Sequence, residues 1–369
     1  MKTIHIDLGR HLYGGGRQVV HLLEGLAALP GEPVLVCREG SELSRAVRNP
    51  AVRVRALPFR GDLDLAWTGR LRRLIREEKP DLLHVHSRIG GFLTALAGTL
   101  EHIPMVHSRR VDNPPHWIDL KFRFPLFRRI VTISEGIRQV MLAHGVPAAQ
   151  LVCVPSAVDT GRYRPGGGRG AFRCELGLAE DCVLVGVVAQ MIPRKGHEVL
   201  FDALPAVLAR HPAIRVLLFG KGPLEPELRR MVRTRGLEGN VMFAGYRTDM
   251  HRVIPCLDLV AHPAWMEGLG VALLETAACG VPLVAARAGG MPEIVHPGVN
   301  GYLIEPGDSH ALTGYLLDLL DHPERRREFG EAGRRLVLER FSVERMVAGN
   351  YAVYREALDQ GGSDGSIRR

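Results

Sequence analysis

The sequence lacks any long apolar run. No stretch approaches the roughly 20 consecutive apolar residues that a membrane-spanning helix needs, and none resembles a signal sequence. The first strand pattern, at Thr3–Leu8, begins almost at the initiator methionine. We therefore expect the protein to be cytoplasmic.

Cysteine is scarce, and its spacing does not indicate a paired site. The six cysteines include no C-x-x-C pair. Four of them lie in or beside apolar runs: Cys37, Cys153, Cys182 and Cys256. We therefore expect reduced cysteines that contribute to packing.

The common motifs for nucleotides and metals are missing as well. Gly14, Gly15 and Gly16 form neither a Walker A loop nor a G-x-G-x-x-G fingerprint. His197 and Glu198 begin like the zinc motif H-E-x-x-H, but residue 201 is a phenylalanine. His84 and His86 have no further ligands at metal spacing, and we expect their side chains on opposite faces of a strand. No metal and no cofactor is predicted.

Positive charge is present, but mainly in one half of the chain. Residues 1–160 hold 22 Lys and Arg against 15 Asp and Glu, a net +7, and residues 161–369 hold 26 against 25, a net +1. Such a half can meet nucleic acid, an anionic membrane or an anionic substrate, or can simply be solvated. Because no nucleic-acid-binding module is recognisable, we expect no nucleic acid partner.

The length and the strand pattern indicate two domains of the α/β class. The 369 residues exceed what one hydrophobic core usually accommodates, and short β-branched runs alternate with helix-length segments, which predicts parallel sheets. The first series of runs is Thr3–Leu8, Pro33–Cys37, Val52–Leu57, Asp81–His86, Ile103–His107, Ile130–Ser134 and Leu151–Val154. The second is Cys182–Ala189, Ile214–Gly220, Val241–Gly245, Leu257–His262, Pro282–Ala286 and Tyr302–Ile304.

Glycine and proline mark the boundary between the two series. We predict Rossmann-like domains at residues 1–158 and 171–340, joined by a linker at 159–170 that is rich in both residues. A C-terminal helix at 341–360 and a disordered tail at 361–369 complete the chain. Because ligands bind outside the carboxyl ends of parallel strands, we expect a cleft between the facing sheets.

The segment His262–Val295 carries the strongest chemical signal. Gly268 and Gly270 allow close approach of the backbone to a ligand, and a helix begins beside them, which suits a diphosphate. Glu267 and Glu275 are anions, so they suit sugar or ribose hydroxyls instead. For two glutamates alone, a solvated helix face is the ordinary alternative.

Together with the following ACG-x-P and GG-x-PE, the two glutamates resemble the donor-site signature of the family-four retaining glycosyltransferases, which have the GT-B fold. The resemblance implies that Glu267 contacts the donor sugar and Glu275 the ribose. It also implies that the backbone of Gly268, Leu269, Gly270 and Val271 holds the diphosphate. The first domain would then bind the acceptor and the second the nucleotide-diphosphate sugar, a co-substrate that is most simply UDP-linked.

The resemblance extends to further residues. Gly15 and Gly16 match the glycine loop that lies against the donor phosphate, and His107, expected at a strand end, matches a histidine near the transferred sugar. Lys195 matches a cation at the leaving diphosphate, whereas Gln190 stands where the family usually has arginine. Lys221 could supply the missing cation at the diphosphate site, although a solvent-facing lysine is the simpler interpretation.

The acceptor is less well defined. The stretches at residues 7–20 and 106–115 resemble a bacterial branch of this family that assembles cell-envelope glycans or the lipopolysaccharide core. A nucleotide-sugar epimerase or a phosphorylase on the same architecture is the alternative function. The segment Pro114–Ile130 either packs onto the core or docks on the inner face of an anionic membrane. Its aromatic and basic residues are Trp117, Phe122, Phe124 and Phe127, with Lys121, Arg123, Arg128 and Arg129.

Overall fold

The computed structural model describes residues 1–364, with side chains to Asp359. Its chain divides into two compact units: unit 1 is Met1–Ala157 together with the segment from Val343, and unit 2 is Val158–Ser342. The first boundary between the units, after Ala157, lies one residue before the predicted end of the first domain at residue 158. Helix α6 begins at Arg169, inside the predicted linker. The last helix, α13, continues to Asp364, and residues 365–369 of the predicted tail lie outside the described residues.

Unit 1 is built on a seven-stranded parallel sheet with the order β3-β2-β1-β4-β5-β6-β7. The strands are β1 (Lys2–Asp7), β2 (Glu32–Arg38), β3 (Arg53–Leu57), β4 (Leu82–Val85), β5 (Met105–Arg109), β6 (Arg129–Thr132) and β7 (Leu151–Cys153). The helices are α1 (Gly14–Leu26), α2 (Glu42–Ala46), α3 (Leu65–Glu78), α4 (Gly91–Leu100), α5 (Glu135–Ala143) and α13 (Val343–Asp364), with short turns η1 (Asp119–Arg123), η2 (Phe124–Leu126) and η3 (Ala148–Gln150). The central strands β4 and β5 are buried along their whole length, as strands covered on both faces are, although they include the polar residues His84, His107, Ser108 and Arg109.

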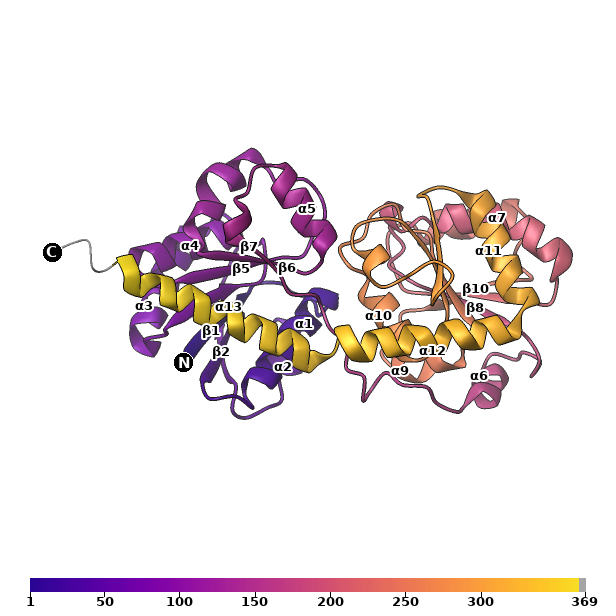
Figure 1. Ribbon diagram of the computed structural model, residues 1–369, viewed down its shortest axis with the longest axis horizontal. Helices are drawn as coiled ribbons and strands as arrows, with labels where there is room; N and C mark the ends of the chain where they lie inside the picture. Colours follow the sequence, from indigo (N-terminus) through magenta and orange to yellow (C-terminus); the bar gives the residue numbers. More distant parts are fainter. Residues whose placement is uncertain (365–369) are drawn as a thin grey trace. The chain divides into compact units, whose positions relative to one another are not determined.

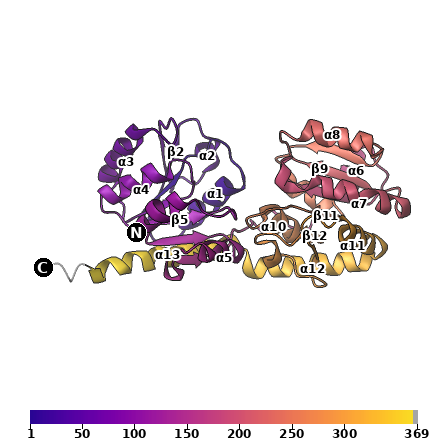
Figure 2. The ribbon, with the colours of Figure 1, turned by 90° about the horizontal axis from the view of Figure 1, so that it is seen from above.

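Unit 2 repeats this topology with six parallel strands in the order β10-β9-β8-β11-β12-β13. The strands are β8 (Leu184–Val188), β9 (Arg215–Phe219), β10 (Val241–Gly245), β11 (Leu259–His262), β12 (Leu283–Ala286) and β13 (Gly301–Ile304). The helices are α6 (Arg169–Glu175), α7 (His197–Arg210), α8 (Glu225–Thr234), α9 (Met250–Val253), α10 (Val271–Ala278), α11 (Ser309–Asp321) and α12 (Pro323–Arg340), with turns η4 (Pro193–Lys195), η5 (Ile254–Cys256) and η6 (Met291–Glu293). Figure 2 shows strands of this sheet between α8 and α12.

The predicted α/β class with two parallel sheets is confirmed, and a strand overlaps each of the thirteen predicted strand segments. One segment is displaced: Ile103–His107 was expected, but β5 runs from Met105 to Arg109. Proline has no N–H to donate to a sheet, so Pro104 delays the strand. The predicted unpaired cysteines are also confirmed, since all six are free. No helix among the described residues is long and apolar enough to cross a bilayer.

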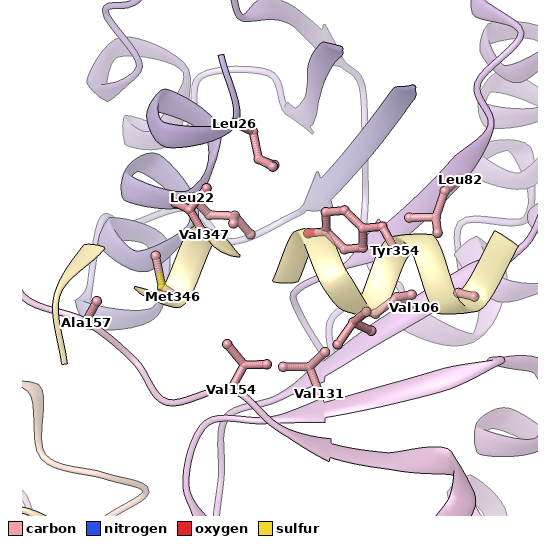
Figure 3. Close-up of a cluster of buried hydrophobic side chains, with 12 residues drawn as sticks. Leu22, Leu26, Leu82, Val106, Val131, Val154, Ala157, Met346, Val347 and Tyr354 are labelled. Carbon is pink, nitrogen blue, oxygen red and sulfur yellow. The ribbon is translucent and has the colours of Figure 1, made fainter. Parts of the chain in front are cut away.

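Helix α13 completes the core of unit 1. In Figure 1 the yellow helix lies across the strands of this sheet. Figure 3 shows Met346, Val347 and Tyr354 of α13 packed in one cluster with residues of helix α1 and of the sheet. The Tyr354 hydroxyl also lies 2.6 Å from Nδ1 of His84, which is fully buried on β4.

Replacing Tyr354 with phenylalanine should lower the free energy of unfolding by about 1 to 3 kcal/mol, because His84 Nδ1 would be left buried without its partner. Urea unfolding of the purified protein measures this. Tyr351→Phe on the same helix is the matched control, since Tyr351 is only half-buried. Equal stability of the Tyr354 variant and the wild type would contradict the role of this hydrogen bond.

Candidate active site

The candidate site of unit 2 lies where the strand order reverses. Strands β8 and β11 are neighbours there, although their carboxyl ends, Val188 and His262, lie 74 positions apart in the sequence. Open parallel sheets bind ligands outside the strand ends at this reversal. The loop after β8 carries Lys195, and the loop after β11 carries Glu267 and leads into α10.

Glu267 is the centre of the site. Its Oε2 atom accepts hydrogen bonds from Lys195 Nζ and, at 3.1 Å, from His262 Nε2. Its Oε1 atom accepts the N–H of Gly268 at 3.2 Å. The side chains of Lys195 and Glu267 are only 9% and 15% exposed, so this ion pair is largely shielded from water.

The electrostatics of the pair follow from this shielding. Burial by itself raises the pKa of the Glu267 carboxyl, but the hydrogen bond from His262 and the charge of Lys195 outweigh it and hold the pKa well below its ordinary value. Burial also lowers the pKa of His262. The site therefore contains a carboxylate, an ammonium group and a neutral imidazole at neutral pH.

Gly196 allows the two loops to touch. Its φ is +64°, and a Cβ atom there would lie 2.0 Å from the carbonyl oxygen of Pro263. Two hydrogen bonds reinforce this contact. The backbone N–H of Trp265 donates to the Arg194 carbonyl at 2.9 Å, and the Trp265 indole N–H donates to Glu198, at the start of α7, at 2.7 Å. Only glycine fits this close approach of the two backbones.

The start of α10 provides the predicted anion-binding feature. Gly270, with φ +98°, precedes the first helical residue Val271, and no acidic residue lies in the first turn. The first amides of a helix have no intrahelical partner and carry its positive dipole end. Leu269 is buried, and Glu275, in the second turn, is only 8% exposed. The start of α10 therefore has the backbone features that favour an anion.

Gln190 and Lys221 lie on adjacent loops. The Met191 N–H donates to the Lys221 carbonyl at 3.2 Å, and a Cβ atom at Gly220 would lie 2.0 Å from the carbonyl oxygen of Ala189. The Lys221 ammonium, however, lies 5.1 Å from the centre of the Tyr246 ring. Its side chain thus rests on an aromatic ring.

In unit 1 the predicted residues occupy two different depths. Gly15 and Gly16 form the first turn of α1, directly after the loop that follows β1. His107 lies within β5 and not at its end, is 3% exposed, and bonds through Nδ1 to the Val85 carbonyl at 3.1 Å. Burial lowers the pKa of His107 to about 3. Its contact with a transferred sugar stays a prediction, and its burial argues against direct contact.

The expectation for His84 and His86 was wrong. Residues two apart on a strand project to the same face, and the two ring centres lie 3.8 Å apart. With His5 they form a trio whose ligand atoms lie within 4.8 Å of one another. Each of the six ring nitrogens already has a hydrogen-bond partner, so the three rings are held in a polar network that ends on the Arg110 guanidinium.

The predicted docking segment divides between core and surface. Phe124 and Phe127 are buried, and Arg123 is buried against Asp119. Trp117 and Phe122 are 61% and 48% exposed. Core packing therefore accounts for Arg123, Phe124 and Phe127, whereas Trp117 and Phe122 are available as a surface.

Two residues escaped the sequence reasoning. His262 was part of the quoted motif but received no role, although its position at a strand end five residues before Glu267 was the available signal. Arg110 follows the end of β5, and this became apparent only when the strand was found to extend past His107.

Comparisons with known proteins identify the family of the chain. The family described as "Glycosyl transferases group 1" matches residues 169–336, and "Glycosyltransferase Family 4" matches residues 13–162. A D-inositol 3-phosphate glycosyltransferase of Segniliparus rotundus is 35% identical over 346 residues, which cover 87% of this chain and 77% of that protein.

A second relative matches over a shorter length. The GDP-mannose-dependent monoacylated alpha-(1-6)-phosphatidylinositol monomannoside mannosyltransferase of Corynebacterium glutamicum is 37% identical over 205 residues. That alignment covers 52% of this chain and 53% of the relative, so it spans about half of each protein.

Solved structures share the fold across nearly the whole chain. Anabaena Alr3699/HepE in complex with UDP has a TM-score of 0.86 at 21% identity, covering 96% of this chain and 100% of that one. The lipopolysaccharide outer core galactosyltransferase WaaB has a TM-score of 0.73 at 17% identity, with the same coverage.

Proposed function

The chain belongs to the family-four glycosyltransferases, retaining enzymes of the GT-B fold that use nucleotide-sugar donors, and we propose that it transfers a hexose to a lipid-linked acceptor of the cell envelope. This family membership removes the reason to consider an epimerase or a phosphorylase. The observation that carries the proposal is the Glu267 carboxylate shared by Lys195 and His262 beside the start of α10.

We assign the leaving diphosphate to Lys195 and to the amides of Gly268–Val271. Negative charge grows on the diphosphate as the sugar departs, and a fixed ammonium group in a site with little water stabilises that charge. Because Gln190 is neutral, Lys195 carries a larger share of this stabilisation than it would beside an arginine. Lys221 is better placed to cover the Tyr246 ring than to supply the cation of the missing arginine.

We assign the donor sugar to Glu267 and the ribose to Glu275. A carboxylate accepts hydrogen bonds from hydroxyl groups, and the depressed pKa of Glu267 keeps it ionised for this purpose. His262, bonded to the same oxygen as Lys195, positions the carboxylate. The pair Lys195–Glu267 thus links the sugar end of the donor to the diphosphate end.

Glu275→Ala is expected to weaken donor binding, whereas Glu267→Ala is expected mainly to slow transfer. Only Glu267 is assigned to the sugar whose bond changes. A hydrogen bond to a charged group contributes about 1.5 to 3 kcal/mol, which corresponds to about tenfold to over a hundredfold. Steady-state kinetics should show a raised KM in the first variant and a lowered kcat in the second.

The matched control is Glu238→Ala, which removes an exposed carboxylate from unit 2 outside the site. It should retain wild-type kinetics. Wild-type kinetics in Glu267→Ala and Glu275→Ala, with folding intact, would contradict both assignments.

A donor screen tests the function itself. The purified protein is incubated with UDP- and GDP-linked hexoses, and slow release of the nucleoside diphosphate is measured with and without candidate glycolipids. We expect release from one donor class, with UDP-linked sugars favoured, and acceleration by an acceptor. Absence of release from every nucleotide sugar, with or without glycolipid, would contradict the proposal.

An exposed apolar surface supports a lipid-linked acceptor. One face of α4 presents Phe92, Leu96 and Leu100, at a spacing of four residues, with 36% to 47% of each side chain exposed. Helix α4 packs against η1, which is preceded by Trp117 and contains Phe122. We call these five residues the apolar surface. Lys121 lies over the Phe122 ring at 5.6 Å and adds a cation.

We propose that this surface docks on an anionic bilayer at the inner face of the cytoplasmic membrane. Aromatic and aliphatic side chains insert at such an interface, and each nearby cation adds about 1 kcal/mol. The mannosyltransferase relative named above is described as acting on a phosphatidylinositol glycolipid, which is an acceptor held in a membrane. Lipopolysaccharide core remains one acceptor within this class.

Co-sedimentation with vesicles containing anionic lipid should be strong at low salt and weaker at high salt. The triple variant Trp117→Ser, Phe122→Ser, Lys121→Gln should reduce the vesicle-bound fraction of the protein several-fold. Leu338→Ser, which alters an exposed leucine of unit 2, is the control. If the wild type ignores such vesicles at low salt, the acceptor is better sought among soluble glycans.

A further inference from the structure

Arg110 stands at the ligand-binding edge of unit 1. Strand β5 ends at Arg109, so Arg110 is the first residue beyond it. Asp7 ends β1 and His86 follows β4, and the order β1-β4-β5 makes these strands neighbours at the reversal point of the sheet. Side chains at this edge are placed as those of unit 2 are around Glu267.

A chain of histidines holds Arg110 in one direction. The Arg110 Nη2 atom lies 3.4 Å from His86 Nδ1. An arginine only donates, so His86 accepts at Nδ1 and carries its proton on Nε2. His86 Nε2 then donates to His5 Nδ1 at 3.0 Å, and the His5 Nε2–H donates to Thr3 Oγ1 at 3.0 Å.

These histidines are neutral, so the charge resides on Arg110. Burial lowers the pKa of His5 to about 3 and the pKa of His86 well below its ordinary value. Burial also lowers the pKa of Arg110, but only to about 10. The guanidinium therefore remains a cation at neutral pH.

This cation is incompletely satisfied. Within the described part of the chain, its Nε atom is buried and has no hydrogen-bond partner. Asp7 acts on this cation electrostatically, but its carboxyl group already accepts the Gly9 N–H at 2.9 Å. A buried donor without an acceptor is costly, and a bound anion would supply the missing acceptor.

The start of α1 lies against the same side chain. A Cβ atom at Gly15 would lie 3.4 Å from Arg110 Cδ. Helix α1 has 13 residues, no side-chain cap at Tyr13 and no acidic residue in its first turn. Its first amides and the Arg110 guanidinium are therefore donors on neighbouring elements, and both favour negative charge.

We propose that Arg110 binds a phosphoryl group of a substrate together with the first amides of α1, and that His86 and His5 hold the guanidinium in position. The inference rests on the proposed glycosyl transfer, since the phosphoryl group comes from one of its substrates. Two sources share this chemistry: the diphosphate of the donor, and a phosphate on the acceptor.

Titration with inorganic phosphate tests the site and separates the two sources. The probe is the imidazole NMR signal of His86 in the full-length protein, because its Nδ1 accepts the Arg110 hydrogen bond. Phosphate should shift this signal. A shift that saturating UDP or GDP abolishes assigns the donor diphosphate, and a shift that persists with the nucleotide assigns an acceptor phosphate.

Arg110→Gln should weaken phosphate binding by about tenfold to a hundredfold, and Arg110→Lys, which keeps the charge, by only a few-fold. Arg73→Gln removes an equal charge from an exposed position on α3 and should leave binding unchanged. The proposal is overturned if folded Arg110→Gln binds phosphate as the wild type does, or if phosphate leaves the wild-type His86 signal unmoved. A failed donor screen with phosphate binding intact would contradict the glycosyl transfer and leave the site standing.

Discussion

Lys195→Met is expected to lower kcat by about a hundredfold or more, which is the usual scale for losing one preorganised donor at a developing charge. The loss should exceed that in relatives with two cations, because Gln190 contributes no charge. Steady-state turnover with the donor identified by the screen measures the effect. If the Lys195→Met variant keeps most of the activity while Lys221→Ala abolishes activity, Lys221 and not Lys195 stabilises the leaving diphosphate.

The same variant should lose stability, because it leaves Glu267 with less compensation for its charge in a largely buried site. Breaking a buried ion pair typically costs about 3 kcal/mol or more, which corresponds to roughly 6 to 12 °C in Tm for a unit of this size. Lys195→Met/Glu267→Gln removes both charges and should recover most of this loss without recovering turnover. A double variant no more stable than Lys195→Met would contradict the coupling of the pair.

Gly196→Ala should be the most disruptive single change in unit 2. The added methyl group would lie 2.0 Å from the Pro263 carbonyl oxygen, which is backbone and cannot rotate away as a side chain would. Relief of this overlap separates the loop of Lys195 from the loop of Glu267. We expect Tm to fall and kcat to drop by at least the hundredfold expected for Lys195→Met.

Gly236→Ala separates the two components of that effect. Gly236 has nearly the same backbone conformation, with φ +66° against +64° for Gly196, but a Cβ atom there meets nothing within 4 Å. It should cost only the left-handed conformation, about 1 to 2 kcal/mol, with unchanged kcat. If the two variants behave alike, backbone conformation and not the contact with Pro263 explains the glycine.

Most strands could be predicted because they are buried in a sheet covered on both faces, which leaves a short run rich in apolar residues in the sequence. The ends were less certain: Pro104 shifted β5 by two residues, and this shift decides whether His107 or Arg110 stands at the edge of the sheet. The assignment of the last helix to unit 1 had no local signal, since it depends on contacts of Tyr354 with residues hundreds of positions earlier.

The site shows the same division. Glu267, Glu275 and Lys195 could be named because their spacing resembles a family signature, but their mutual contact could not, because it depends on β8 and β11 being neighbours. The burial of each aromatic side chain also could not be predicted from the sequence. Trp117 and Phe122 are exposed while Phe124 and Phe127, in the same aromatic run, are buried.

The discontinuous composition of unit 1 has a consequence for synthesis on the ribosome. Its core needs Met346, Val347 and Tyr354, so residues 1–157 must wait while the 185 residues of unit 2, 158–342, are made. At about 5 to 20 residues per second this interval lasts roughly 10 to 40 seconds. During that time the apolar side chains of Leu22, Leu26 and Val106 have no helix to cover them, and a nascent chain stopped before Val343 would leave them so permanently.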